Sequence, residues 1–190
     1  MGAMRRFSVR PALTLRGRKF KGLRGWAGKP LHPPLTDIPV AAYIMGAVFD
    51  VIAVVGRDNA WAEDFFHAGT YVFVAGAVVS VFAALTGFWD WWKSSEKGTQ
   101  ARRTINTHAA AMVTVTVLAL IDIALRLDTY NTRDYPNTAT WLLSVVIAAL
   151  VSLGAIYGGS LVYEYGSNVE TAGDHPVWHK SETDVFPGQH

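Results

Sequence analysis

The sequence GFWDWWKSSEKGTQARRTINTH, residues 87–108, joins two long apolar segments of this 190-residue chain. Residues 65–88 on one side contain no Asp, Glu, Lys or Arg, and residues 105–125 on the other side contain only Asp122. At about 1.5 Å per helical residue, either segment is long enough to cross a hydrocarbon core about 30 Å thick. The quoted stretch is therefore predicted to be the turn between two membrane-spanning helices.

The charge of this turn indicates the side of the membrane on which it lies. Between residues 93 and 103 the single acid Glu96 stands against four basic residues, Lys93, Lys97, Arg102 and Arg103. Loops that stay on the cytoplasmic side of a membrane are the ones that retain Lys and Arg. The turn is therefore expected to face the cytoplasm.

Two further apolar segments, residues 36–56 and 140–163, flank this hairpin. Thr36 stands where a helix N-cap is expected, and Pro39 would fall in the first turn of that helix. Together the four segments predict an all-α membrane protein, a four-transmembrane-helix bundle that occupies residues 36–163.

An even number of spans returns the chain to the side on which it started, so both termini are expected to be cytoplasmic. This topology places 14 of the 17 Lys and Arg residues on that side. Residues 1–35 are predicted to form a basic cytoplasmic arm, which lies on the lipid surface or docks on a partner protein. Residues 164–190 are predicted to form a polar cytoplasmic tail. Because a membrane span follows the basic arm directly, anionic lipid rather than nucleic acid is its expected partner.

Composition excludes several kinds of chemistry. A hydrophobic content of 51% and a mean hydropathy of +0.20 are high for a soluble chain of this size. The sequence has no cysteine, which excludes disulfides, iron–sulfur clusters held by thiolates and a cysteine nucleophile. It also shows no phosphate-binding glycine loop, nucleophile elbow or HExxH motif. Because no catalytic motif is visible, the sequence does not indicate an enzyme.

Small and polar residues recur every seven positions along the predicted spans. This spacing drifts only about 20° per heptad on a helix, so such residues share one face. Small residues allow membrane helices to approach closely. In the second span the seam consists of Gly69, Gly76, Ala83 and Asp90, and in the fourth span Gly154 and Gly158 form a shorter pair.

One polar cluster is predicted at the cytoplasmic face, where His32, Asp90 and His108 share a depth. Two imidazoles and a carboxylate can hold a divalent metal ion. Two imidazoles on opposite sides of a porphyrin can hold haem b, with Arg102 and Arg103 near its propionates. The alternative is structural: His108 hydrogen-bonds Asp90 or a helix end and holds the hairpin in place.

A second polar cluster is predicted at the outer face and consists of Asp50, His67, Asp122 and Arg126. The spacing of Asp122 and Arg126 predicts a local ion pair within one helix. A proton or ion relay is the alternative, because charged residues inside membrane spans often mark such pathways. A relay needs a continuous polar track, and the spans offer few polar residues between the two clusters.

The motif residues of these spans resemble those of a known family. They are His32 and Pro33 ahead of a span with Pro39 and Asp50, Gly87 with Asp90, and Arg103 with His108. Over roughly residues 31–165 the chain resembles four-helix bacterial membrane proteins of unknown function that also occur fused to Rieske iron–sulfur domains. The resemblance implies a setting near membrane electron transfer, with His32, Asp90 and His108 at the matching positions. Since this chain has no cysteine, a Rieske partner would be a separate polypeptide.

Three functions are consistent with these features. The first is a multi-pass protein of the bacterial inner membrane that acts as an accessory subunit of a larger membrane electron-transfer complex, with a separate Rieske or other redox protein as partner. The second is an electron carrier that binds haem b or a metal through His32 and His108. The third is a small proton or ion transporter that uses Asp50 and Asp122.

Overall fold

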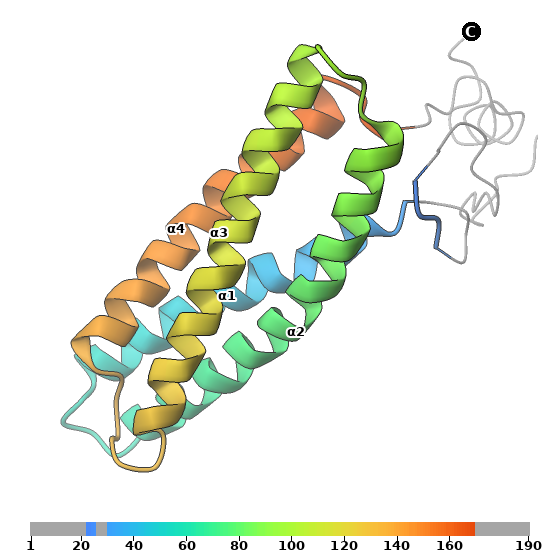
Figure 1. Cartoon of the computed structure of the whole chain (residues 1–190). Helices are drawn as coiled ribbons and strands as arrows, with labels where there is room; N and C mark the ends of the chain where they lie inside the picture. The colour runs from blue at the N-terminus through green and yellow to red at the C-terminus, as the bar shows by residue number, and fades with distance from the viewer. Residues whose placement is uncertain (1–21, 26–29, 170–190) are drawn as a thin grey trace, which may run out of the picture.

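The computed structural model describes residues 22–25 and 30–169, which form a bundle of four α-helices (Figure 1). The helices are α1 (His32–Val55), α2 (Ala62–Ser94), α3 (Gln100–Thr129) and α4 (Thr138–Tyr163). Each is long and apolar enough to cross a membrane, and the described residues form no β-strand. The predicted all-α class with four membrane-spanning helices is thus confirmed. Most of the predicted arm (1–35) and tail (164–190) lies outside the described residues.

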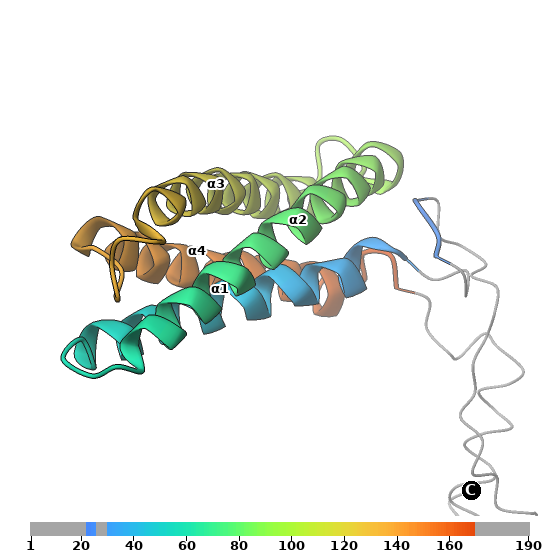
Figure 2. The same cartoon turned by 90° about the horizontal axis from the view of Figure 1, so that it is seen from below.

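The helices are arranged as two pairs. In Figure 2, α1 runs beside α2, α3 runs beside α4, and the two pairs cross at an angle. Helix α1 also packs against α4, and α2 against α3. The start of α1 and the end of α4 lie at the end of the bundle that carries the α2–α3 turn (Figure 1). We call this the hairpin end, and the opposite end, with the other two loops, the loop end.

The first helix begins earlier than its sequence predicts. It starts at His32 with Leu31 as N-cap, and the hydroxyl of Thr36 donates to the carbonyl of Pro33 at 2.7 Å instead of capping a helix. The predicted Thr36 cap is therefore wrong. The helix can begin earlier because proline is tolerated in the first turn of a helix, where its missing N–H would have no partner anyway. His32 consequently belongs to the first turn of α1.

The turn of the hairpin is also shorter than its sequence predicts. Helix α2 continues to Ser94 and α3 starts at Gln100, so only residues 95–99 are non-helical. Thr99 caps α3 by accepting from the backbone N–H of Arg102 at 3.1 Å, and Gly98 supplies a positive φ of 82°. With 33 and 30 residues, α2 and α3 are about 50 and 45 Å long. They exceed a hydrocarbon core of about 30 Å, so at least one end of each extends beyond it.

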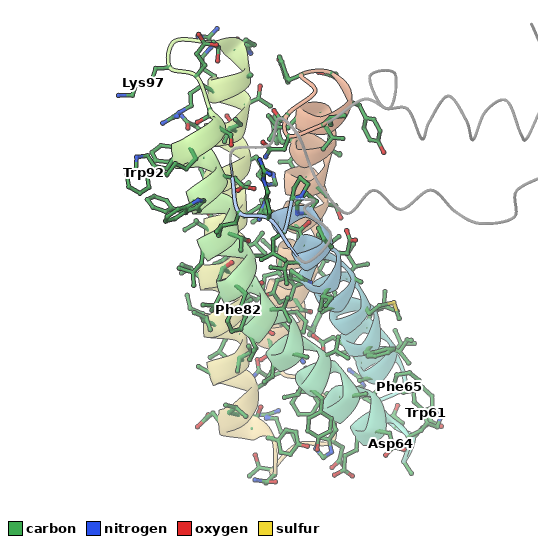
Figure 3. All side chains as sticks on the ribbon, turned by 90° about the vertical axis from the view of Figure 1, so that its right-hand side faces the viewer. Trp61, Asp64, Phe65, Phe82, Trp92 and Lys97 are labelled. Atoms are coloured by element: carbon green, nitrogen blue, oxygen red, sulfur yellow. The ribbon has the colours of Figure 1, made fainter. Side chains whose placement is uncertain are left out.

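The outward faces of the helices are apolar. Large hydrophobic side chains stand exposed along them, among them Leu85 at 62%, Phe88 at 61% and Ile156 at 66% of full exposure. Exposed apolar surface of this extent is unfavourable in water but is the surface that a lipid bilayer covers. Aromatic and charged side chains mark both ends: Trp92 and Lys97 point away from the bundle at the hairpin end, and Trp61 and Asp64 lie at the loop end (Figure 3).

The predicted seam of α2 is confirmed, because all four of its residues are buried. A Cβ on Gly76 would lie 2.8 Å from the Cβ of Ala42, and one on Gly69 would lie 3.3 Å from a carboxylate oxygen of Asp50. The seam therefore faces α1, and its small residues let the two backbones approach. The buried core beside it contains Tyr43, Phe73, Val115, Ala119, Ile147 and Val151.

Replacing Gly76 with leucine should destabilise the bundle, because even a Cβ at this position clashes with α1. Overpacking of this kind typically costs about 1–3 kcal/mol. Val78→Leu is the matched control, since Val78 lies on the same helix and is 56% exposed. Thermal unfolding in detergent measures both variants. Equal unfolding temperatures would contradict the close packing of α2 on α1.

Candidate functional site

Two histidines from different helix pairs meet at the hairpin end of the bundle. His32 comes from the first turn of α1, and His108 from the third turn of α3. Their ring centroids lie 6.4 Å apart with the ring planes at 81°. Both side chains are half-buried. We call them the histidine pair.

Each ring of the histidine pair is fixed by a backbone carbonyl. The Nδ1 atom of His32 lies 2.9 Å from the carbonyl oxygen of Ala83 in α2, and that of His108 lies 2.8 Å from the carbonyl oxygen of Gly154 in α4. A carbonyl only accepts, so Nδ1 must donate, and the neutral ring then carries its lone pair on Nε2. No described residue forms a hydrogen bond with either Nε2 atom. The pair thus presents two Nε2 lone pairs without a hydrogen-bond partner among the described residues.

Glycines make room for both rings. A Cβ on Gly87 would lie 2.6 Å from Cε1 of His32, and a Cβ on Gly158 would lie 3.2 Å from Cε1 of His108. The neighbouring Gly159 has nothing within 4 Å of its Cβ position. The small residues of α2 and α4 therefore shape the histidine site as well as the helix contacts.

Asp90, the third residue predicted for this cluster, has a different contact. Its Oδ1 accepts from the backbone N–H of Leu23 at 3.0 Å, which ties the segment before α1 to the end of α2. His108 binds the middle of α4 rather than Asp90 or a helix end. In residues 22–25 and 30–169, no three His, Asp or Glu side chains are placed to hold a metal ion together. His32 and His108 are the members of the predicted set that lie ring to ring.

The two arginines that were expected near a cofactor have partners in the hairpin. Arg102 donates from Nη1 to the carbonyls of Trp91 and Ser95, at 3.3 and 3.1 Å, and its guanidinium lies 4.0 Å from the centre of the Trp91 ring. Arg103 is exposed and donates to the side-chain carbonyl of Gln100. Arg102 therefore stabilises the turn between α2 and α3.

Three charged side chains form a fully buried cluster toward the loop end, which we call the charge triad. The guanidinium of Arg126 donates to both carboxylate oxygens of Asp50, with Nη1 at 2.8 Å from Oδ1, and its Nε donates to Oδ2 of Asp122 at 2.5 Å. None of the three has any exposed surface. The predicted ion pair between Asp122 and Arg126 is confirmed, and the bidentate pair with Asp50 joins α3 to α1 across the interior.

His67, which was predicted to belong to the outer cluster, lies apart from the triad contacts. Its Nε2 lies 3.1 Å from the backbone carbonyl oxygen of Tyr130, and the two rings stack with centroids 4.1 Å apart. The hydroxyl of Tyr130 donates to that of Tyr71. These two tyrosines were not predicted, because Tyr130 reaches α2 only through the crossing of the helices, which sequence spacing does not give.

Four long apolar helices in a single bundle define this chain as an all-helical, multi-pass membrane protein. It belongs to the family described as predicted membrane protein (DUF2231), whose model matches residues 28–171. No curated protein and no solved structure matches the chain. The family description names no activity.

Proposed function

We propose that this protein is an electron-transfer subunit of the bacterial inner membrane that holds a haem b between His32 and His108. The separation of the two rings, 6.4 Å between centroids, carries the proposal. An iron or other metal ion bound by both Nε2 atoms at about 2 Å each would place the ring centroids about 6 Å apart. Metal binding does not fix the angle between the ring planes, because rotation of a ring about its metal–nitrogen bond leaves the bond length unchanged.

The surroundings of the two rings also fit metal ligation. Histidines that bind metals usually donate their other ring N–H to a carbonyl or carboxylate, which fixes the tautomer and orients the ring. Ala83 and Gly154 supply such carbonyls. Haem needs only two ligands from the protein because the porphyrin supplies four nitrogens, whereas a bare divalent ion such as zinc takes three or four protein ligands. The lack of a third ligand among the described residues favours haem over a lone metal ion.

When bound, haem would supply one-electron oxidation and reduction of its iron. The contribution of the chain is to hold and orient the two imidazoles and to surround them with apolar helices. An electron carrier needs a donor and an acceptor, and a separate Rieske or other redox protein is the partner that we propose. If His32 and His108 bind nothing, they still tie α1 to α2 and α3 to α4. The protein would then be an accessory subunit without a cofactor.

An absorption spectrum tests the cofactor directly. Protein purified in detergent from cells supplied with haem should show a Soret band, and either His32→Ala or His108→Ala should abolish it. His67→Ala is the matched control, because His67 is also half-buried and bonded to a backbone carbonyl but lies at the other end of the bundle. Wild-type protein that stays colourless, even after titration with haemin, would overturn the carrier. The His108→Ala change would then cost only the part-buried hydrogen bond with Gly154, about 1–3 kcal/mol.

The orientation in the membrane is a separate proposal, in which the hairpin end and both termini lie in the cytoplasm. The basic residues support it, because 14 of 17 Lys and Arg residues would then be on that side. Alkaline phosphatase is active only outside the cytoplasm, so its fusion after residue 189 should be inactive and its fusion within the α3–α4 loop should be active. The reverse pattern of activity would refute the cytoplasmic assignment.

A further inference from the structure

We propose that the charge triad is a proton-binding site, and that Oδ1 of Asp122 is the atom that takes the proton. This site lies toward the loop end of the bundle, away from the histidine pair, and the proposal does not depend on haem binding. Three observations carry it: the balance of charge, the hydrogen bonds of the individual oxygens, and the depth of burial.

The charges of the triad do not balance. Asp50 and Asp122 bring two carboxylates to a single guanidinium, and all three side chains have no exposed surface. With every group ionised the triad would carry one net negative charge inside a membrane protein. Burying an uncompensated charge is far more costly than burying a neutral polar group. One bound proton makes the triad neutral.

The hydrogen bonds show which oxygen is available. Both oxygens of Asp50 accept from Arg126, and Oδ2 of Asp122 accepts from its Nε. The fourth oxygen, Oδ1 of Asp122, is buried and has no hydrogen-bond partner in the described part of the chain. A proton from water would therefore add to this atom, which converts the Asp122 carboxylate to a carboxylic acid while Arg126 and Asp50 keep their bidentate pair.

The neighbouring helices bring no second cation to the triad. Within the described residues, the charged groups that contact Asp122 and Asp50 are those of the triad itself. On the α2 side the ring of Phe73 lies 4.3 Å from the Arg126 guanidinium and Gly69 packs beside Asp50, while the titratable His67 of the same helix bonds to Tyr130. The buried polar residues of α4 at this end, Thr140 and Ser144, do not titrate.

Arg126 lies in the last turn of α3, so the triad is within about one to two helical turns of the water at the loop end. A proton can thus be exchanged with that side of the membrane by a small opening of the helix ends. Between the triad and the histidine pair the buried core of the described bundle is mainly apolar, and Tyr43 and Ser80 share a hydrogen bond there. The triad therefore binds a proton from one side of the membrane and does not pass it across the bundle.

Infrared spectroscopy tests the site, because a protonated carboxylic acid and a carboxylate absorb at different frequencies. The full-length wild-type protein in lipid should show a carboxylic acid band at neutral pH that shifts in D₂O. Asp122→Asn should remove this band and should fold, since the pair between Asp50 and Arg126 is retained. Asp50→Asn should remove it too, because Asp122 alone then balances Arg126. Asp64→Asn, at an exposed acid of α2, should leave the band unchanged.

Each alternative outcome contradicts the proposal. If Asp122→Asn leaves every carboxylic acid band of the wild type in place, Asp122 does not hold a proton. If the band survives in Asp50→Asn, balance of charge is not what retains the proton. If the wild type shows no such band but gains thermal stability from Na⁺ and not from K⁺ at constant pH, the triad binds a metal cation instead.

Discussion

Replacing Arg126 with methionine should produce the largest loss of stability of any single substitution in the described bundle. The variant would leave the Asp50 carboxylate and the Asp122 side chain buried without the guanidinium that bonds to three of their four oxygens. Removal of one partner from a buried ion pair typically costs about 3–5 kcal/mol. The contact with the ring of Phe73 would be lost as well. Thermal unfolding in detergent and the yield of folded protein from membranes measure the effect.

Two controls separate the triad from a general effect of removing charge. Arg103→Met changes an exposed arginine of the same helix and should shift stability by less than about 0.5 kcal/mol. Combining Arg126→Met with Asp50→Asn and Asp122→Asn removes every charge of the triad and should restore part of the stability. Equal stability of the Arg126 and Arg103 variants would show that the buried contacts contribute nothing to the fold.

The helices and one of their contact faces follow from the sequence because the bilayer imposes a simple rule. A segment without charges over more than 20 residues has to be helical there, since its backbone groups find no other partners in lipid. The seam from Gly69 to Asp90 could be predicted because its residues are small and keep one period. The start of α1 was missed since Thr36 offered a plausible cap. The prolines beside His32 set the boundary instead.

Contacts between helices that are distant in the sequence were less predictable. The pair between Asp122 and Arg126 follows from a spacing of four residues, whereas the bidentate contact of Asp50 with Arg126 depends on how α1 and α3 are rotated. Asp90 was grouped with the histidines because it shares their depth. Depth does not fix the direction of a side chain, and Asp90 turns to the backbone of Leu23. No sequence pattern marks that contact, because its donor is a main-chain N–H.

The second large effect is expected at Gly87, through the position of His32. In Gly87→Ala the new methyl group would lie 2.6 Å from Cε1 and 2.9 Å from Nδ1 of the His32 ring, so the ring has to move. The movement breaks its hydrogen bond with the carbonyl of Ala83 and changes its distance from His108. If the two rings hold haem, this single methyl group should abolish the Soret band. The loss is expected even though alanine stabilises a helix by about 1 kcal/mol relative to glycine.

A series of three alanine variants distinguishes displacement of the rings from a general effect of changing glycine. The space around the added methyl group increases along the series. The methyl group would lie 2.6 Å from His32 in Gly87→Ala and 3.2 Å from His108 in Gly158→Ala, and it would have nothing within 4 Å in Gly159→Ala. Loss of haem absorbance should follow the same order, complete for Gly87→Ala, partial for Gly158→Ala and absent for Gly159→Ala. Nitrogen NMR of the imidazoles in the absence of haem should show the Nδ1–H tautomer of His32 lost only in Gly87→Ala. One outcome would contradict ligation by His32: Gly87→Ala loses this tautomer but keeps its haem absorbance. The ring would then have moved without consequence for the cofactor, so His32 would not be a ligand.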